Sequence, residues 1–118
     1  MKFEYHEKIK PFVRMTQRGK FVKKEAQDYL ASKAALGYAL RVQMQQAEAQ
    51  PLEQAQTFEL TMRYFAPDVY RYDLDNVIKA VLDAAQNIVF PDDRYCIDII
   101  ASKARAVHFR LEMEIVKV

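Results

Sequence analysis

Four carboxylates and a lysine gather in one part of the chain: Asp73, Asp75, Lys79, Asp92 and Asp93. The first two lie two residues apart, the lysine follows one helical turn later, and the acidic pair comes after a further segment of helix length. Carboxylate oxygens are hard ligands, and Mg²⁺ or Mn²⁺ suits a few carboxylates together with water and phosphate oxygens. The spacing therefore raises the hypothesis of a divalent metal site within residues 73–93.

Ordinary helix chemistry explains the same residues without a metal. Asp is favoured just before a helix, and acidic residues in a first turn gain about 0.3–1 kcal/mol from the helix dipole. Lys79 can pair with Asp75 and Asp83 at a spacing of four residues, and Pro-Asp-Asp-Arg at 91–94 has the composition of a turn. The pattern alone leaves both interpretations open.

Length and charge narrow the class of protein. A chain of 118 residues can bury one core, so we expect a single domain over residues 1–118. One cysteine allows no internal disulfide, and no apolar run has the roughly 20 residues of a membrane span, so we expect a cytoplasmic protein. Eight Lys and Arg against two Glu give residues 1–24 a charge of +6, which leaves −4 for the remainder of a chain of net +2. This asymmetry suggests a polyanion at one part of the protein and a cation at the other.

Hydrophobic periodicity predicts a small α/β or α+β domain. Alternation indicates strands over residues 2–6, 57–64, 95–102 and 107–115, and helices are expected over about 23–48 and 74–87, with Asn87 as a left-handed terminator. A basic segment of about residues 9–24 reads as a loop. On the first helix the residues Tyr29, Leu30, Ala34, Gly37, Arg41 and Met44 fall near one face, with Ala26 and Leu40 flanking them, so we expect a long helix packed on one side. The result is a mixed or antiparallel sheet with two main helices.

The acidic region resembles a known signature. The run Asp73-Leu74-Asp75-Asn76-Val77-Ile78-Lys79, then Asp83-Ala84 and Asp92-Asp93, is similar to that of the RusA-type Holliday junction resolvases. The basic segment before the first helix and Lys103 also resemble the family. The resemblance implies a homodimeric, Mg²⁺-dependent endonuclease of bacterial or phage origin, acting in DNA recombination and repair. Such enzymes cut two strands of a four-way DNA junction symmetrically.

The resemblance also implies roles for individual residues. Asp73, Asp75 and Asp93 would hold Mg²⁺, with Mn²⁺ as an alternative and Asp92 in support. Lys79 would be the catalytic lysine, and Asn76 would orient a ligand. Asp83 is left outside the site, as a partner of Lys79. Candidates for contacts with DNA phosphates are the basic residues Arg14, Arg18, Lys20, Lys23, Lys24, Arg71 and Lys103.

Two alternatives remain at this stage. The chain has only Pro11 where many family members have a proline-rich loop after the first strand, so its preferred substrate is open. One alternative is a DNA-binding module of the same fold without catalysis. The other is a Mg²⁺-dependent nuclease for other branched DNA.

Overall fold

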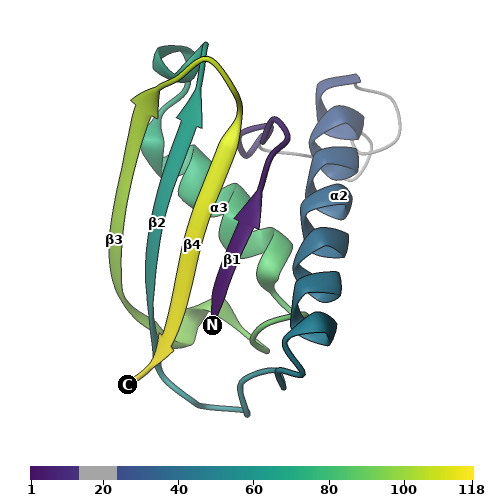
Figure 1. Cartoon of the computed structure of the whole chain (residues 1–118), viewed down its shortest axis with the longest axis vertical. Coiled ribbons are helices and arrows are strands. Elements are labelled where there is room, and N and C mark those ends of the chain that lie inside the picture. The colour runs from purple at the N-terminus through teal and green to yellow at the C-terminus, as the bar shows by residue number, and fades with distance from the viewer. Residues whose placement is uncertain (14–23) are drawn as a thin grey trace.

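The alternating stretches of the sequence form one four-stranded sheet in the computed structural model, which describes residues 1–13 and 24–118. Its strands are β1 (Lys2–Tyr5), β2 (Phe58–Ala66), β3 (Cys96–Arg105) and β4 (Arg110–Lys117), in the order β1-β4-β2-β3. β4 runs antiparallel to β1 and to β2, whereas β3 runs parallel to β2 (Figure 1). The predicted mixed sheet is therefore confirmed.

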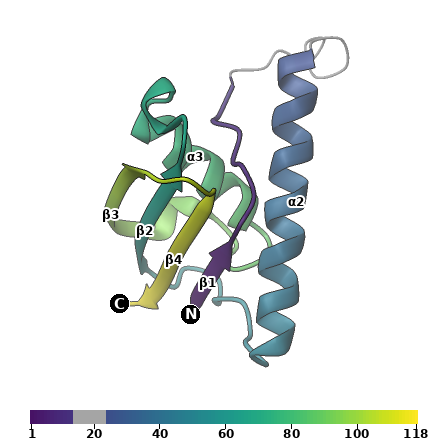
Figure 2. The same ribbon diagram turned by 45° about the horizontal axis from the view of Figure 1, so that its top comes forward.

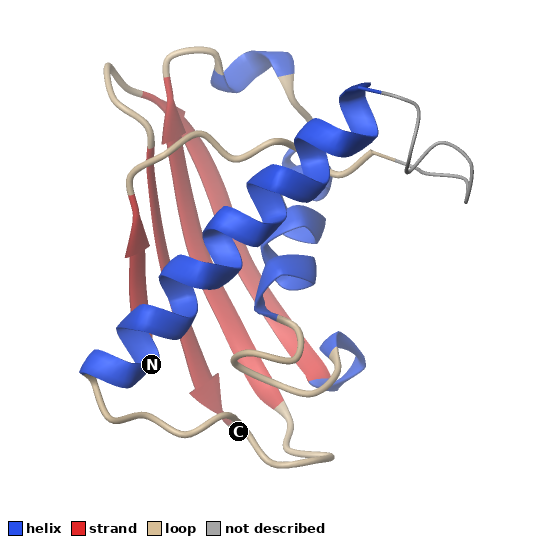
Figure 3. Cartoon of the chain, turned by 90° about the vertical axis from the view of Figure 1, so that its right-hand side faces the viewer, coloured by secondary structure: helices blue, strands red, loops and turns tan. Residues whose placement is uncertain are grey.

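Two long helices in the described part of the chain accompany the sheet. α2 (Lys24–Gln46) lies beside β1, and α3 (Leu74–Ala85) lies behind the sheet and connects β2 to β3 (Figures 1 and 2). Viewed from the side, α2 crosses in front of α3, with the sheet as a separate layer (Figure 3). Two short 3₁₀ helices, η1 (Val69–Arg71) and η2 (Asp93–Tyr95), flank this connection. A parallel strand pair needs such a crossover, so α3 must run back along the sheet.

The core lies between the sheet and the helices. Val77 and Val81 of α3 belong to the same buried cluster as Leu60 and Met62 of β2. Full burial of each such side chain contributes about 1.5–3 kcal/mol. Because α3 buries one face and exposes the other, its polar residues must lie on the side turned away from the sheet.

Element boundaries differ from the sequence prediction where the chain crosses over a strand. β3 and β4 lie on either side of β2, so residues 106–109 must pass over its end. The Ala106 amide donates to the Ala66 carbonyl there at 3.2 Å, and β4 begins only at Arg110. The predicted strand start at residue 107 was thus wrong, since alternation continues through a turn. Asn87 has a φ of 67°, as predicted, although α3 ends two residues earlier.

The buried face of α2 is largely the one predicted. Tyr29, Gly37 and Met44 are buried, and so are the flanking residues Ala26 and Leu40. Leu36 is buried as well, whereas Ala34 and Arg41 are exposed. The apolar stripe on this helix is narrow, so the sequence could not fix the edges of the buried face. Arg41 is therefore available on the surface.

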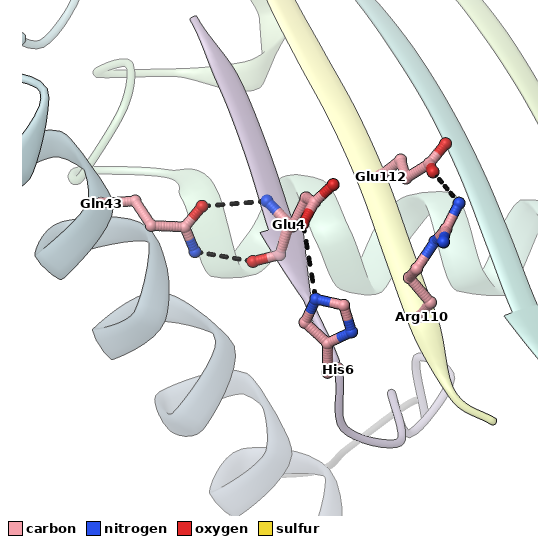
Figure 4. Close-up of polar contacts among 5 residues, drawn as sticks. All are labelled: Glu4, His6, Gln43, Arg110 and Glu112. Carbon is pink, nitrogen blue, oxygen red and sulfur yellow. Dashed lines mark hydrogen bonds and ion pairs between the residues drawn. The ribbon is translucent and has the colours of Figure 1, made fainter.

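One edge of the sheet is closed by a side chain of α2. The Gln43 amide donates from Nε2 to the Glu4 carbonyl at 2.6 Å, and its Oε1 accepts the Glu4 amide at 2.9 Å (Figure 4). Gln43 thus takes the place of a neighbouring strand beside β1. On the opposite edge, β3 has no further neighbour among the described residues, and it exposes Ile97 and Ile100 by 58% and 64%. An unpaired strand with exposed isoleucines is a ready partner for another strand.

Candidate active site

The N-terminus of α3 presents two carboxylates. Asp73 occupies the N-cap, where its carbonyl accepts the Asn76 and Val77 amides at 3.2 and 3.3 Å. Its side chain makes no capping hydrogen bond. Asp75 lies in the first turn, and among the described residues neither carboxylate joins an ion pair. Both side chains are exposed and remain available to a ligand, so Asp73 does not serve as the side-chain cap that helix chemistry alone suggested.

Lys79 lies one turn beyond Asp75 and contacts an aromatic ring. Its Nζ is 4.1 Å from the centroid of Phe12, which corresponds to about 0.5–1 kcal/mol of cation–π attraction at an exposed position. Phe12 is fixed in turn, because its amide donates to the Asn76 carbonyl at 3.1 Å and its ring packs edge-on against Tyr29. The spacing of four residues places Lys79 on the same face of α3 as Asp75, and Phe12 gives the Lys79 side chain a fixed contact there.

Asp83 has a different partner from the one predicted. Its Oδ2 accepts the Tyr29 hydroxyl at 2.7 Å. Burial, and then this bond, raise the pKa of Tyr29. No ion pair in the described part of the chain joins Asp83 to Lys79, so the predicted pairing was wrong. Asp83 instead fastens α3 to α2.

A second acidic group lies at the beginning of β3. Asp92 caps η2, since its Oδ1 accepts the Arg94 amide at 3.0 Å. Burial, followed by the charges of Asp92 and Asp83, raises the pKa of Asp93. Carboxylates that raise one another's pKa repel in the absence of a cation. Asp93 is therefore the carboxylate in this group that would gain most from a bound cation.

The two acidic groups lie at opposite ends of the β2–α3–β3 unit. Asp73 follows the end of β2, whereas Asp93 precedes Cys96, which pairs with Phe58 at the start of β2. The 12 residues of α3 span about 18 Å at 1.5 Å per residue. No group of three or more His, Cys, Asp or Glu within residues 1–13 and 24–118 is placed to hold a metal ion. The loop after α3 does not return Asp92 and Asp93 to the start of the helix within one chain.

The predicted DNA contacts have different surroundings. Lys24 begins α2 and Arg71 ends η1, and both are exposed. The Lys103 ammonium donates to the Tyr72 carbonyl at 2.5 Å, which ties β3 to the residue before Asp73. Four further candidates lie outside the described residues: Arg14, Arg18, Lys20 and Lys23.

Sequence reasoning missed an anchor beside the site. The Lys8 ammonium lies 2.9 Å from Asp68 Oδ2, which also accepts the Tyr72 hydroxyl at 3.3 Å. The hydrogen bond from Lys8 is the main cause that lowers the pKa of Asp68. These partners are 60 residues apart, and Pro67-Asp68 reads as a simple turn, so no local pattern could reveal them. The anchor holds the segment that leads into Asp73.

No helix in the described ranges is both long and apolar enough to cross a membrane.

The chain was compared with curated proteins and with models of protein families. A search of curated proteins finds no match. The family model described as endodeoxyribonuclease RusA matches residues 9–116, which is nearly the whole chain and includes both acidic groups and Lys79. The chain belongs to the RusA family of endodeoxyribonucleases.

Proposed function

We propose that the protein is a Mg²⁺-dependent endonuclease that resolves four-way DNA junctions as a homodimer. The observation that carries this proposal is the start of α3, where, among the described residues, Asp73 makes no side-chain cap, neither Asp73 nor Asp75 joins an ion pair, and Lys79 lies one turn beyond Asp75. Free carboxylates beside an ammonium group suit a cation and a phosphate better than they suit helix capping.

The donors at this end of α3 fit a hard cation. Mg²⁺ is usually held by one or two carboxylates, with waters and substrate phosphate oxygens completing its shell, and Asp73 and Asp75 offer that number. A bound Mg²⁺ supplies a water of lowered pKa and stabilises charge at the scissile phosphate. Lys79 neutralises negative charge on the phosphate during attack, and Asn76 is proposed to orient a ligand. Mn²⁺ offers the same chemistry.

The assignment of Asp93 to the same centre requires two chains. β3 is the open edge of the sheet, and antiparallel pairing about a two-fold axis near Ile100 would place Ile100 beside the partner's Ile100. In this pairing the start of the partner's β3 lies near the end of β3 that carries Lys103. At that end the Lys103 ammonium donates to the carbonyl of Tyr72, the residue before Asp73. We propose that the partner's Asp93, supported by the partner's Asp92, completes the metal site there.

Such a dimer matches the symmetry of its substrate. One isologous interface generates two identical sites, and a four-way junction offers two strands related by a two-fold axis. Each site would then cut one strand. An enzyme of this design resolves the junction rather than leaving a single nick.

Subunit mixing tests the shared site directly. We expect the Asp75→Asn and Asp93→Asn homodimers to be inactive. A mixed dimer would hold one site with both carboxylates intact and one site with neither, so mixing should restore nicking of one strand. If every site lay within one chain, both sites of the mixed dimer would be damaged. Absence of nicking after mixing, with exchange proven by differently tagged subunits, would refute the shared site.

A panel of DNA substrates tests the activity. Four-way junctions, flaps and linear duplexes are incubated with the protein, with and without Mg²⁺, and the products are resolved on a denaturing gel. We expect paired cuts in the four-way junction only, and junction binding without cleavage by the Asp75→Asn variant. Equal cutting of flaps would instead identify a general nuclease for branched DNA. Binding without any cut by the wild-type protein would identify a DNA-binding module.

A further inference from the structure

A cavity of about 380 Å³ opens between α2 and the end of α3, and the proposed catalytic groups leave it unused. Gly37 and Ala84, both buried, form its base. The exposed side chains of Lys33, Tyr38 and Arg41 line its outer part. All three outer residues come from α2, which the sequence pattern did not connect with function.

The hollow shape follows from small residues where the helices meet. A Cβ atom on Gly37 would lie 3.0 Å from Ile88 Cδ1 and 3.3 Å from the Ala84 carbonyl oxygen, so the missing side chain at Gly37 lets α2 approach the end of α3 closely. Asn87, left-handed at a φ of 67°, lies directly beyond α3 and lines the cavity together with Ile88. Small residues at the contact between the two helices therefore form the base of the cavity.

The outer part of the cavity carries positive charge without neutralisation. Lys33 and Arg41 are eight residues apart, which places them on one face of α2 and about 12 Å apart along its axis. Neither forms an ion pair with any residue of the described chain. Asp83 is the one acidic residue among the described residues of the lining, and its carboxylate, which accepts the Tyr29 hydroxyl, offsets only one of the two positive charges. An anion can therefore reach both cations without displacing an existing partner.

We propose that this α2–α3 cavity binds a backbone phosphate of DNA, held by Lys33 and Arg41, with the Tyr38 ring stacking on an adjacent base. The proposal rests on the proposed junction-cutting function and extends the DNA path along α2. The guanidinium of Arg41 suits phosphate oxygens, and Tyr38 is 71% exposed, so its ring face is free to stack. The cavity is also close along the chain to the second acidic group, since Asn87 and Ile88 in its lining precede Asp92 in the segment after α3.

The test measures how junction binding depends on salt. A fluorescent four-way junction is titrated with the full-length Asp75→Asn protein, which holds DNA without cutting it, at KCl concentrations from about 50 to 200 mM. Adding Lys33→Ala and Arg41→Ala should lower the slope of log K against log salt by about 0.9, because the one phosphate that both side chains hold is no longer neutralised. Tyr38→Ala should weaken binding without changing the slope, and Tyr38→Phe should restore it.

A matched control removes two positive charges elsewhere. Lys2 and Arg63 lie on the face of the sheet that no helix covers, so Lys2→Ala with Arg63→Ala changes net charge equally and should leave the slope close to that of the parent. Equal slopes for the cavity variant and its parent would overturn the cavity as a phosphate site. If the cavity variant binds the junction as its parent does but has lost binding to a protein partner, the cavity is a protein-binding site and the phosphate proposal is wrong. If the parent protein does not bind the junction at all, the proposed function itself fails.

Discussion

Replacing Gln43 by Ala should open the β1 edge of the sheet and destabilise the protein. The substitution removes two hydrogen bonds between the Gln43 amide and the backbone of Glu4, at 2.6 and 2.9 Å. Hydrogen bonds of this kind contribute about 0.5–1.5 kcal/mol each, so the free energy of unfolding should fall by about 1–3 kcal/mol. For a domain of this size, that loss corresponds to a melting temperature lower by roughly 4–12 °C.

Thermal unfolding by circular dichroism, at fixed protein concentration, measures this change. Gln45→Ala is the matched control, because it removes an exposed glutamine from the same last turns of α2 and gives the same gain in helix propensity. Gln43→Glu is the second variant, since it keeps an acceptor for the Glu4 amide but places a carboxylate oxygen against the Glu4 carbonyl. Equal melting temperatures for Gln43→Ala and Gln45→Ala would refute the argument that this amide closes the edge.

Three further predictions concern the site and its anchor. Lys79→Ala should bind the junction but cut it roughly a hundredfold or more slowly, as measured in single-turnover assays. Asp93→Asn should melt at a higher temperature than wild type at neutral pH in EDTA. Burial and the charges of Asp92 and Asp83 raise the pKa of Asp93 in the folded protein, so the ionised carboxyl destabilises the fold once the pH exceeds that pKa. A lower melting temperature for the variant would contradict this argument. Asp68→Asn should lose about 1 kcal/mol at neutral pH, since it replaces the carboxylate that accepts from Lys8 by a neutral amide oxygen. The folded pKa of Asp68 is lowered, so wild type should lose that advantage only as pH falls below about 3.9, and unfolding curves for the two proteins should then converge.

The sequence predicted the elements of the fold well because their signals are local. Alternation identified β2, and the polar stripe of α3 placed Asp75 and Lys79 on one face. The relation between the two acidic groups is not local. It depends on β3 being parallel to β2, which sends α3 back along the sheet and separates Asp73 from Asp93. No periodicity within either segment carries that information.

The anchors around the site were missed for the same reason. Lys8 follows β1 and Asp68 follows β2, so only the folding of the chain brings these two residues, 60 positions apart, into contact. The edges of the buried face of α2 were missed because Ala and Gln dominate the helix and give its faces similar hydrophobicity. Leu36 is buried without having been predicted, and Arg41, expected near the packed face, lies at the surface beside the cavity.

The length of α3 fixes the distance between the two acidic groups that lie before and after it. One inserted residue would lengthen the helix by 1.5 Å and rotate everything after it by about 100°. Asp93 would then leave its position beside Asp83, and β3 could keep its pairing with β2 only by strain in the following turn. A shift of β3 by one residue would turn every one of its side chains to the opposite face. We therefore expect the connection from β2 to β3 to tolerate changes of residue type far better than changes of length.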